Sequence, residues 1–294
     1  MLFLKKMSFT NFFIWKPGSV MWFICAFLAV ALMIILTYSL RDKKENEKDI
    51  YVLFLSLFNA IFFLWYRGIE WIMSDSIQGY EFNIWNELPL HLCNLNIILM
   101  PIAIVVKKKF LFCYVFFTAS LGSFFALIAP FPPFSNCPIY IPTTFGFVWT
   151  HFNLMIISVL YITLGYYKPR LKDSYKIILT FVVVSVSIHL INLLFNKLVY
   201  PTNFFYTMGT ENIGLLNVFW KLIPYRFFYL IFGLLILTVF VFMFTLSYSV
   251  FLSLSKTRKQ VKEDAYYKVL NHHSRFIIFT NQFREEFVKV LVEA

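Results

Sequence analysis

The sequence predicts an all-α polytopic membrane protein, a bundle of seven transmembrane helices with a short amphipathic helical tail at the C-terminus. Composition is the first reason: of 294 residues, 60% are hydrophobic and only 14% are charged, whereas soluble domains are about one-quarter charged. The second reason is a series of apolar stretches of roughly 20 residues, the length that crosses the hydrocarbon core as a helix. They lie at about 18–40, 50–71, 88–106, 110–129, 148–167, 175–197 and 225–252.

The distribution of Lys and Arg predicts the orientation of these helices. Basic residues concentrate in 41–49, 107–109, 168–176 and the segment after 253, and they are scarce in 72–87, 130–147 and 198–224. Because basic loops stay on the cytoplasmic side, we expect the N-terminus outside and the C-terminus inside. The net charge of +11 then faces anionic lipid and does not indicate a nucleic-acid partner.

Three segments are expected along the chain. Residues 1–17 form an interfacial lead, 18–252 the membrane domain, and 253–294 a basic cytoplasmic tail. The tail repeats apolar side chains every four residues, as an amphipathic helix does, at Phe279, Phe283, Phe287 and Leu291. The abundance of Phe, Ile, Lys and Asn is typical of an AT-rich genome and favours a bacterial cytoplasmic membrane.

Ionisable side chains inside the spans are costly and therefore mark candidate functional positions. With the predicted orientation, those of four helices fall in the outer half of the membrane, together with several amides. This shared depth predicts one polar site beneath the outer head groups, formed by Arg67, Glu70, His91, Cys93, Asn94, Asn96, His151, His189 and Asn192.

Each of these residues also has an ordinary structural interpretation. Arg67 and Glu70 are spaced to pair with each other, and a membrane histidine often bonds a neighbouring helix. Cys93 alone is typical of a core position, but a thiol near an imidazole is the usual activated nucleophile. His91 would point roughly 160° away from Cys93 on a regular helix, so His151 or His189 is the better base unless Pro89 distorts that turn.

The motif LPLHLC at 88–93 resembles the bacterial YwaF family of integral membrane proteins and their eukaryotic relatives, transmembrane protein 164. Further segments fit in the same order across about 50–250. They are GSFFALIAP at 122–130, FVWTHFNLMIISVLY at 147–161, and Asn192 followed by PTNFFY at 201–206. In the last of these, Pro-Thr-Asn-Phe stands where the family has Gly-Thr-Asn-Tyr.

The resemblance implies a heptahelical, CoA-independent acyltransferase that moves fatty acyl chains between phospholipids and lysophospholipids without a cofactor. Cys93 would carry the acyl group as a thioester, and His151 would be the base. Such chemistry requires oxyanion donors, for which the candidates are Asn94, Asn96, Asn192 and Asn203. Arg67, with Glu70 beside it, would hold the phosphate.

Two other classes of function stay open from the residues themselves. His91, His151 and His189 from three helices would suit a zinc-dependent lipid hydrolase with an open position for water. The same polar groups would also suit a non-enzymatic protein that binds or transports lipid. Metal analysis of the purified protein separates the first of these from the acyltransferase.

Overall fold

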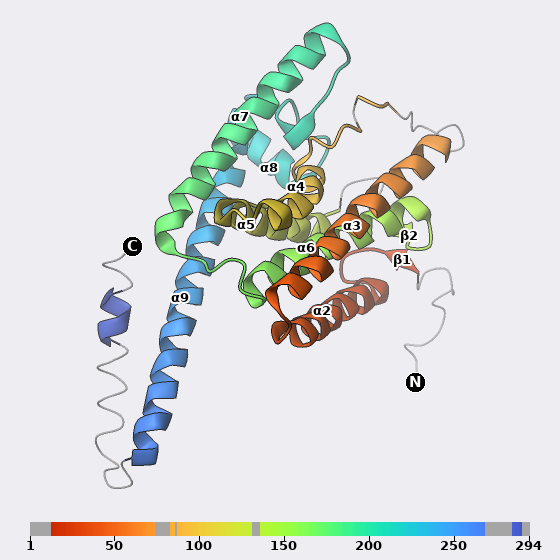
Figure 1. Cartoon of the computed structure of the whole chain (residues 1–294). Helices are drawn as coiled ribbons and strands as arrows, with labels where there is room; N and C mark the ends of the chain where they lie inside the picture. The colour runs from red at the N-terminus through yellow and green to blue at the C-terminus, as the bar shows by residue number, and fades with distance from the viewer. Residues whose placement is uncertain (1–12, 74–82, 86, 131–135, 268–283, 290–294) are drawn as a thin grey trace, which may run out of the picture.

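The computed structural model describes residues 13–73, 83–85, 87–130, 136–267 and 284–289, without the side chains of 256–267. The regular elements of the described chain are helices apart from two short paired strands (Figure 1). In order, the elements are β1 Ile14–Trp15, α2 Val20–Arg41, α3 Glu45–Met73, α4 Leu92–Val106, α5 Lys109–Ile128, β2 Cys137–Pro138, α6 Pro142–Thr163, a 3-10 turn Leu171–Asp173, α7 Ser174–Leu198, a 3-10 turn Phe204–Tyr206, α8 Gly214–Leu222, a 3-10 turn Phe228–Leu230 and α9 Ile231–Tyr267.

Six helices in the described part of the chain are long and apolar enough to cross a membrane, which confirms a multi-pass helical protein. The predicted span 88–106 is shorter than expected, because α4 covers only 15 residues. Pro89 precedes it and His91 has extended backbone as its N-cap, while Lys107 ends it in the left-handed conformation at φ 54°. The count of seven crossings therefore remains a prediction.

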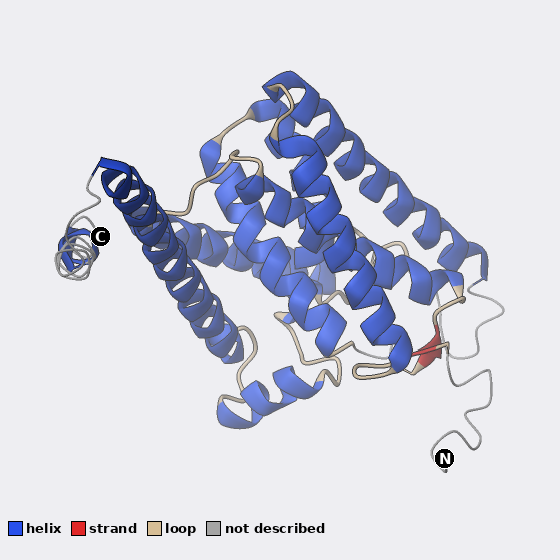
Figure 2. Ribbon diagram, turned by 90° about the horizontal axis from the view of Figure 1, so that it is seen from below, coloured by secondary structure: helices blue, strands red, loops and turns tan. Residues whose placement is uncertain are grey.

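Helix α6 is the centre of the bundle, and it packs against α2, α3 and α5. Figure 2 shows that helices form almost the whole molecule, with the small strand pair at its edge. Close approach of α3 requires Gly146, since a Cβ there would lie 2.3 Å from the Tyr66 ring. The helix begins at Pro142 rather than near 148, because proline suits the first turn. His151 consequently lies in the third turn of α6, deeper than its predicted place at the helix start.

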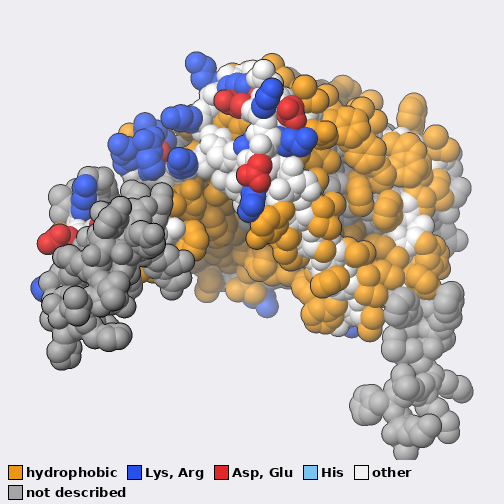
Figure 3. Space-filling view, turned by 60° about the horizontal axis from the view of Figure 1, so that its bottom comes forward, with side chains coloured by type: hydrophobic (Ala, Val, Ile, Leu, Met, Phe, Trp, Pro, Cys, Tyr) orange, Lys and Arg blue, Asp and Glu red, His pale blue; other side chains and the backbone are white. Residues whose placement is uncertain are grey.

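The bundle has two ends that differ in charge. At one end, Lys107 pairs with Asp49 and the hydroxyl groups of Thr37 and Thr163 lie 3.2 Å apart. This end carries the basic loops 41–44, 107–109 and 168–176. Figure 3 shows Lys and Arg gathered along one edge beside a wide hydrophobic surface, as expected for a protein surrounded by lipid.

At the opposite end, β1 pairs antiparallel with β2, with Trp15 opposite Cys137. Trp22 Nε1 donates to the Leu127 carbonyl oxygen at 2.9 Å, which ties the start of α2 to the end of α5. The strand fixes part of the predicted interfacial lead, because Trp15 is completely buried.

The first residues of the predicted tail, 253–267, belong to α9, which continues to Tyr267. Residues 284–289 are helical, and Phe287 among them is exposed. The predicted apolar positions Phe279, Phe283 and Leu291 lie outside the described residues.

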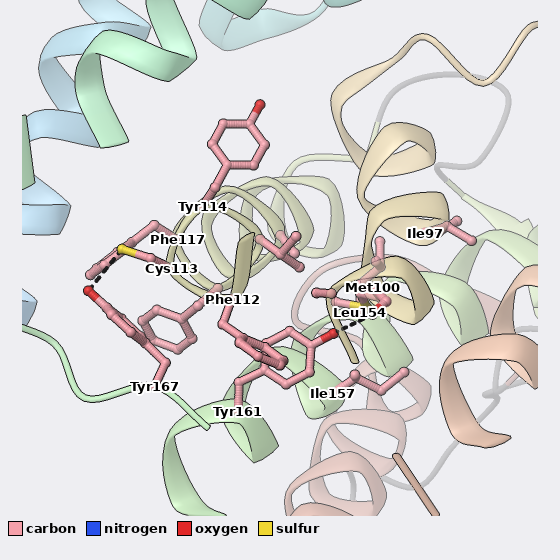
Figure 4. Close-up of a cluster of buried hydrophobic side chains, with 14 of the residues drawn as sticks. Ile97, Met100, Phe112, Cys113, Tyr114, Phe117, Leu154, Ile157, Tyr161 and Tyr167 are labelled. Atoms are coloured by element: carbon pink, nitrogen blue, oxygen red, sulfur yellow. Dashed lines mark hydrogen bonds between the residues drawn. The ribbon is translucent and has the colours of Figure 1, made fainter. Parts of the chain in front are cut away.

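Aromatic side chains fill the core between α4, α5 and α6 (Figure 4). Two of its polar side chains are hydrogen-bonded within it: the Tyr161 hydroxyl donates to the Met100 carbonyl oxygen at 2.9 Å, and Cys113 Sγ donates to the Tyr167 hydroxyl at 2.9 Å. The buried Tyr114 hydroxyl has no hydrogen-bond partner among the described residues. This core holds α4, α5 and α6 together, and the same three helices also line a cavity.

Candidate functional site

A cavity of about 1200 Å³ lies between the α3–α6 bundle and the unit formed by α7, α8 and α9. Figure 1 shows α7 and α9 running side by side along one flank of the molecule, and the two helices are in contact. The polar residues that line the cavity come from seven separate segments. They are Tyr66, Arg67, Glu87, His91, Cys93, Asn94, Thr118, His151, Ser185, Asn196, Thr202, Asn203, Tyr206, Glu211 and Arg226.

The N-terminus of α4 opens into this cavity. His91 is its N-cap and provides no side-chain capping bond. Among the described residues, the first bond of the helix is Leu95 N–H to the His91 carbonyl oxygen, at 2.8 Å. The N–H groups of Leu92, Cys93 and Asn94 therefore have no partner there, and free N–H groups at a helix start stabilise negative charge.

Cys93 is the second residue of α4, and its thiol is reduced and half-buried. It faces Gly122 of α5, where a Cβ would lie 3.4 Å from the sulfur. The small residue leaves space beside the thiol, and the described residues provide no hydrogen bond to it. A thiol at a helix start, on the wall of a cavity, has the position of a nucleophile.

His151 projects from α6 into the same cavity and is 6% exposed. Its Nδ1 lies 2.7 Å from the Phe147 carbonyl oxygen. Since a carbonyl only accepts, Nδ1 of the neutral ring carries the proton, and Nε2 keeps a lone pair. A base needs that lone pair to accept a proton.

The other two histidines predicted for the site differ from each other. His91 lines the cavity with its ring 5.3 Å from that of Tyr206. Its extended backbone removes the objection that the helix would point it away from Cys93. His189 is instead stacked on Phe227 at 4.8 Å and is not part of the cavity wall. The structure therefore keeps His91 and His151 as candidate bases and separates His189 from them.

The four amides predicted as oxyanion donors differ in whether their N–H groups are already hydrogen-bonded within the protein. Both amide hydrogens of Asn192 are used, by the Phe204 carbonyl oxygen and Thr207 Oγ1, each at 2.8 Å. Those of Asn203 bond the Gly209 carbonyl oxygen and Glu211 Oε1.

Asn96 is buried behind the cavity, where it donates to the Leu92 carbonyl oxygen and accepts from Thr118. Asn94 lines the cavity without a hydrogen bond to any described residue. Of the four predicted amides, Asn94 is the one whose donors remain available to a ligand.

Arg67 is held by two carboxylates rather than one. Its Nη1 lies 2.6 Å from Glu70 and 2.8 Å from Glu87. The predicted pairing with Glu70 is thus confirmed, and Glu87 is an addition. This cluster has more negative than positive charge, so Arg67 is poorly placed to attract a phosphate on its own. Arg226, at the edge of the cavity, has no ion pair with a described residue.

Sequence reasoning missed Glu87, Tyr206, Arg226 and the role of Gly122. Lys221 is the one basic residue between 198 and 224, and Arg226 lies within the predicted last span, 225–252. Glu87 lies directly before the LPLHLC motif, where its charge was a usable signal.

The described residues contain no group of three His, Cys, Asp or Glu side chains placed to hold a metal ion. Together with the position of His189, this gives the three-histidine zinc alternative no geometric support.

Comparison with known proteins gives one match. The family model described as the TMEM164 family matches residues 13–244, most of the chain. No curated protein and no solved structure matches it. The match confirms the transmembrane protein 164 resemblance, whereas the YwaF resemblance stays a prediction.

Proposed function

This chain belongs to the TMEM164 family, and we propose that it is a membrane acyltransferase that moves fatty acyl chains between phospholipids through a thioester on Cys93. The observation that carries the proposal is the cavity itself. It brings together a thiol at an open helix start, two histidines and an unpaired amide, contributed by Cys93, His91, His151 and Asn94.

The first half-reaction follows from these groups. Burial disfavours a resting thiolate, so a histidine takes the thiol proton as the sulfur attacks the ester carbonyl carbon. The new C–S bond pushes the carbonyl electrons onto oxygen, and Asn94 and the free N–H groups of α4 stabilise that charge. When the carbonyl reforms, the ester C–O bond breaks and the lysophospholipid leaves with the proton from the histidine.

The second half-reaction reverses the first with another acceptor. The hydroxyl of a lysophospholipid gives its proton to the histidine and attacks the thioester carbonyl. The C–S bond then breaks, and Cys93 recovers the proton. Transfer needs no cofactor, because the thioester keeps the energy of the ester bond.

The shape of the cavity suits a phospholipid. Along α7 its wall runs from Asn196 to Phe181, about 22 Å at the rise of a helix. The residues that line it are largely apolar and include Phe219, Leu234 and Leu237, and the exposed Arg226 lines it as well. An acyl chain would occupy the apolar part, and Arg226 would contact the phosphate.

A seventh crossing by α4 is part of the proposal. The pairing of Trp15 with Cys137 supports a position of both residues on one side of the membrane, and with it an even number of crossings by α2 to α5. The ion pairs Arg67–Glu87 and Lys107–Asp49 also attach the two ends of the α4 segment to opposite ends of α3.

With seven crossings, the basic loops lie in the cytoplasm, the N-terminus lies outside and the cavity faces the outer leaflet. A bacterial cytoplasmic membrane is the proposed location.

The test is acyl exchange by the purified protein in nanodiscs. A phosphatidylcholine with an alkyne-tagged acyl chain is the donor, and an untagged lysophospholipid is the acceptor. We expect tagged product from the wild type and none from Cys93→Ala or Cys93→Ser. Release of free tagged fatty acid alone would indicate hydrolysis. Equal transfer by Cys93→Ala would overturn the thioester mechanism, and tight lipid binding without any turnover would favour the lipid-binding alternative.

A further inference from the structure

The loop between α7 and α8 contains consecutive residues in an unfavourable backbone conformation. Phe205 and Tyr206 have φ of 55° and 57°, a left-handed conformation that costs about 1–2 kcal/mol for a residue with a side chain. Such strain persists only where the surroundings enforce it, and it often marks a functional position.

Hydrogen bonds from both flanks enforce this conformation. Asn192 of α7 donates to the Phe204 carbonyl oxygen and accepts from the Phe204 N–H at 3.0 Å. From the other side, the Tyr229 hydroxyl contacts the Tyr206 carbonyl oxygen and lies 3.0 Å from that of Gly209. The loop is therefore fixed on α7 and on the segment leading into α9.

The strained backbone presents Tyr206 to the cavity. Its ring lies 5.3 Å from that of His91, and its side chain lines the cavity together with Cys93 and Asn94. The described residues offer its hydroxyl no hydrogen bond, whereas the Tyr229 hydroxyl, in the segment leading into α9, contacts two backbone carbonyl oxygens. A hydroxyl held in place without a partner is available to a ligand.

The electrostatic surroundings keep this hydroxyl protonated. Burial raises the pKa of Tyr206 above its ordinary value, nearby Cys93 and Glu211 add to the increase, and Arg67 opposes it. A protonated phenol is a hydrogen-bond donor, and it gains most when negative charge forms on an oxygen beside it.

We propose that Tyr206 is a further catalytic residue of the acyl transfer, donating its hydroxyl hydrogen bond to the carbonyl oxygen that becomes negative when Cys93 attacks. This inference rests on the proposed function and adds a side-chain donor opposite Asn94 and the α4 N–H groups. The hydroxyl keeps its proton throughout, so the balance of the reaction is unchanged.

The test compares Tyr206→Phe with the wild type during a single turnover in nanodiscs that contain the alkyne-tagged phosphatidylcholine. Formation of the hydroxylamine-labile adduct on Cys93 is followed at several donor concentrations. Loss of one oxyanion donor costs about 100- to 1000-fold in rate. We therefore expect a fall of that size at saturating donor, with the half-saturating concentration unchanged. Tyr140→Phe, an exposed tyrosine on the same side of the proposed topology, is the matched control and should react at the wild-type rate.

The thermal unfolding midpoint distinguishes a catalytic role from a structural one. Because the hydroxyl has no partner in the described structure, Tyr206→Phe should unfold at the wild-type temperature. A wild-type adduct rate in Tyr206→Phe would overturn this inference while leaving the Cys93 mechanism intact. A change confined to the half-saturating concentration would also overturn it. Absence of the adduct from the wild type would overturn the proposed function itself.

Discussion

Two cysteines on neighbouring helices have opposite surroundings. Cys113 on α5 is 3% exposed and donates to the Tyr167 hydroxyl at 2.9 Å within the aromatic core (Figure 4). Cys93 on α4 is half-buried at an uncapped helix start, beside Gly122 and a cavity.

The difference extends to the polar groups around each cysteine. In the core, the Cys113 thiol is hydrogen-bonded to the Tyr167 hydroxyl, and this pairing stabilises the fold. Around the cavity, the donors of Asn94 and Tyr206 and the N–H groups of α4 have no partners among the described residues. We infer that the core holds the helices in position, while the cavity keeps unpaired groups for a substrate.

The largest expected difference concerns thiol reactivity. Treatment with N-ethylmaleimide in nanodiscs should modify Cys93 and leave Cys113 unmodified, because reagent reaches a cavity wall but not a packed core. Peptide mass spectrometry measures both sites in one sample and separates them from Cys25 and Cys137. Equal modification of the two would show that the comparison is wrong.

A second test compares two histidines, His151 on the cavity wall and His189 away from it. His151→Ala should lower acyl transfer by about 100- to 10,000-fold, the contribution of a general base. His189→Ala should stay near the wild-type rate, because His189 stacks on Phe227 away from the cavity wall. The exchange assay with tagged phosphatidylcholine measures both. A greater loss in His189→Ala would contradict the assignment of the cavity.

Two glycines test packing in the two regions. Gly146→Ala places a Cβ 2.3 Å from the Tyr66 ring and should destabilise the bundle by about 1–3 kcal/mol. Gly122→Ala meets Cys93 Sγ at 3.4 Å, an ordinary contact, and should slow adduct formation while leaving stability unchanged. Thermal unfolding of both variants measures this difference. Equal stability of the two variants would contradict the prediction that only Gly146→Ala disturbs the packing.

The smallest expected effect lies at the edge of the cavity. Arg226→Gln should raise the half-saturating phospholipid concentration by about two- to fivefold, because one exposed charge contact is worth ~0.5–1 kcal/mol. Lys221→Gln, at the end of α8 and off the cavity wall, is the control. A larger effect in the control would place the phosphate elsewhere.

The membrane architecture was predictable because long apolar stretches identify helices without any knowledge of packing. The presence of Cys93, His91 and His151 at one polar cavity was predictable as well, since ionisable or reactive side chains are rare in membrane spans. The first residue of α4 was not predictable. The predicted span begins at residue 88, whereas the helix begins at Leu92, because its start depends on the local conformation of Pro89 and His91. Tyr206 lay among many tyrosines, and only its backbone and missing partner distinguish it.

The roles of the amides also required the structure. Asn192 and Asn203 have the side chain of an oxyanion donor, but their hydrogens are bonded to the loop that contains Tyr206. Sequence pattern places a polar group at a depth, whereas hydrogen bonds decide whether that group serves the fold or a ligand.

The most direct test of the account is mass spectrometry of the Cys93 peptide from protein purified in its native lipid. We predict a hydroxylamine-labile fatty acyl group on Cys93, absent from Cys113 in the same sample. An unmodified Cys93 in protein that is actively exchanging acyl chains would contradict the central claim that this thiol carries the acyl group.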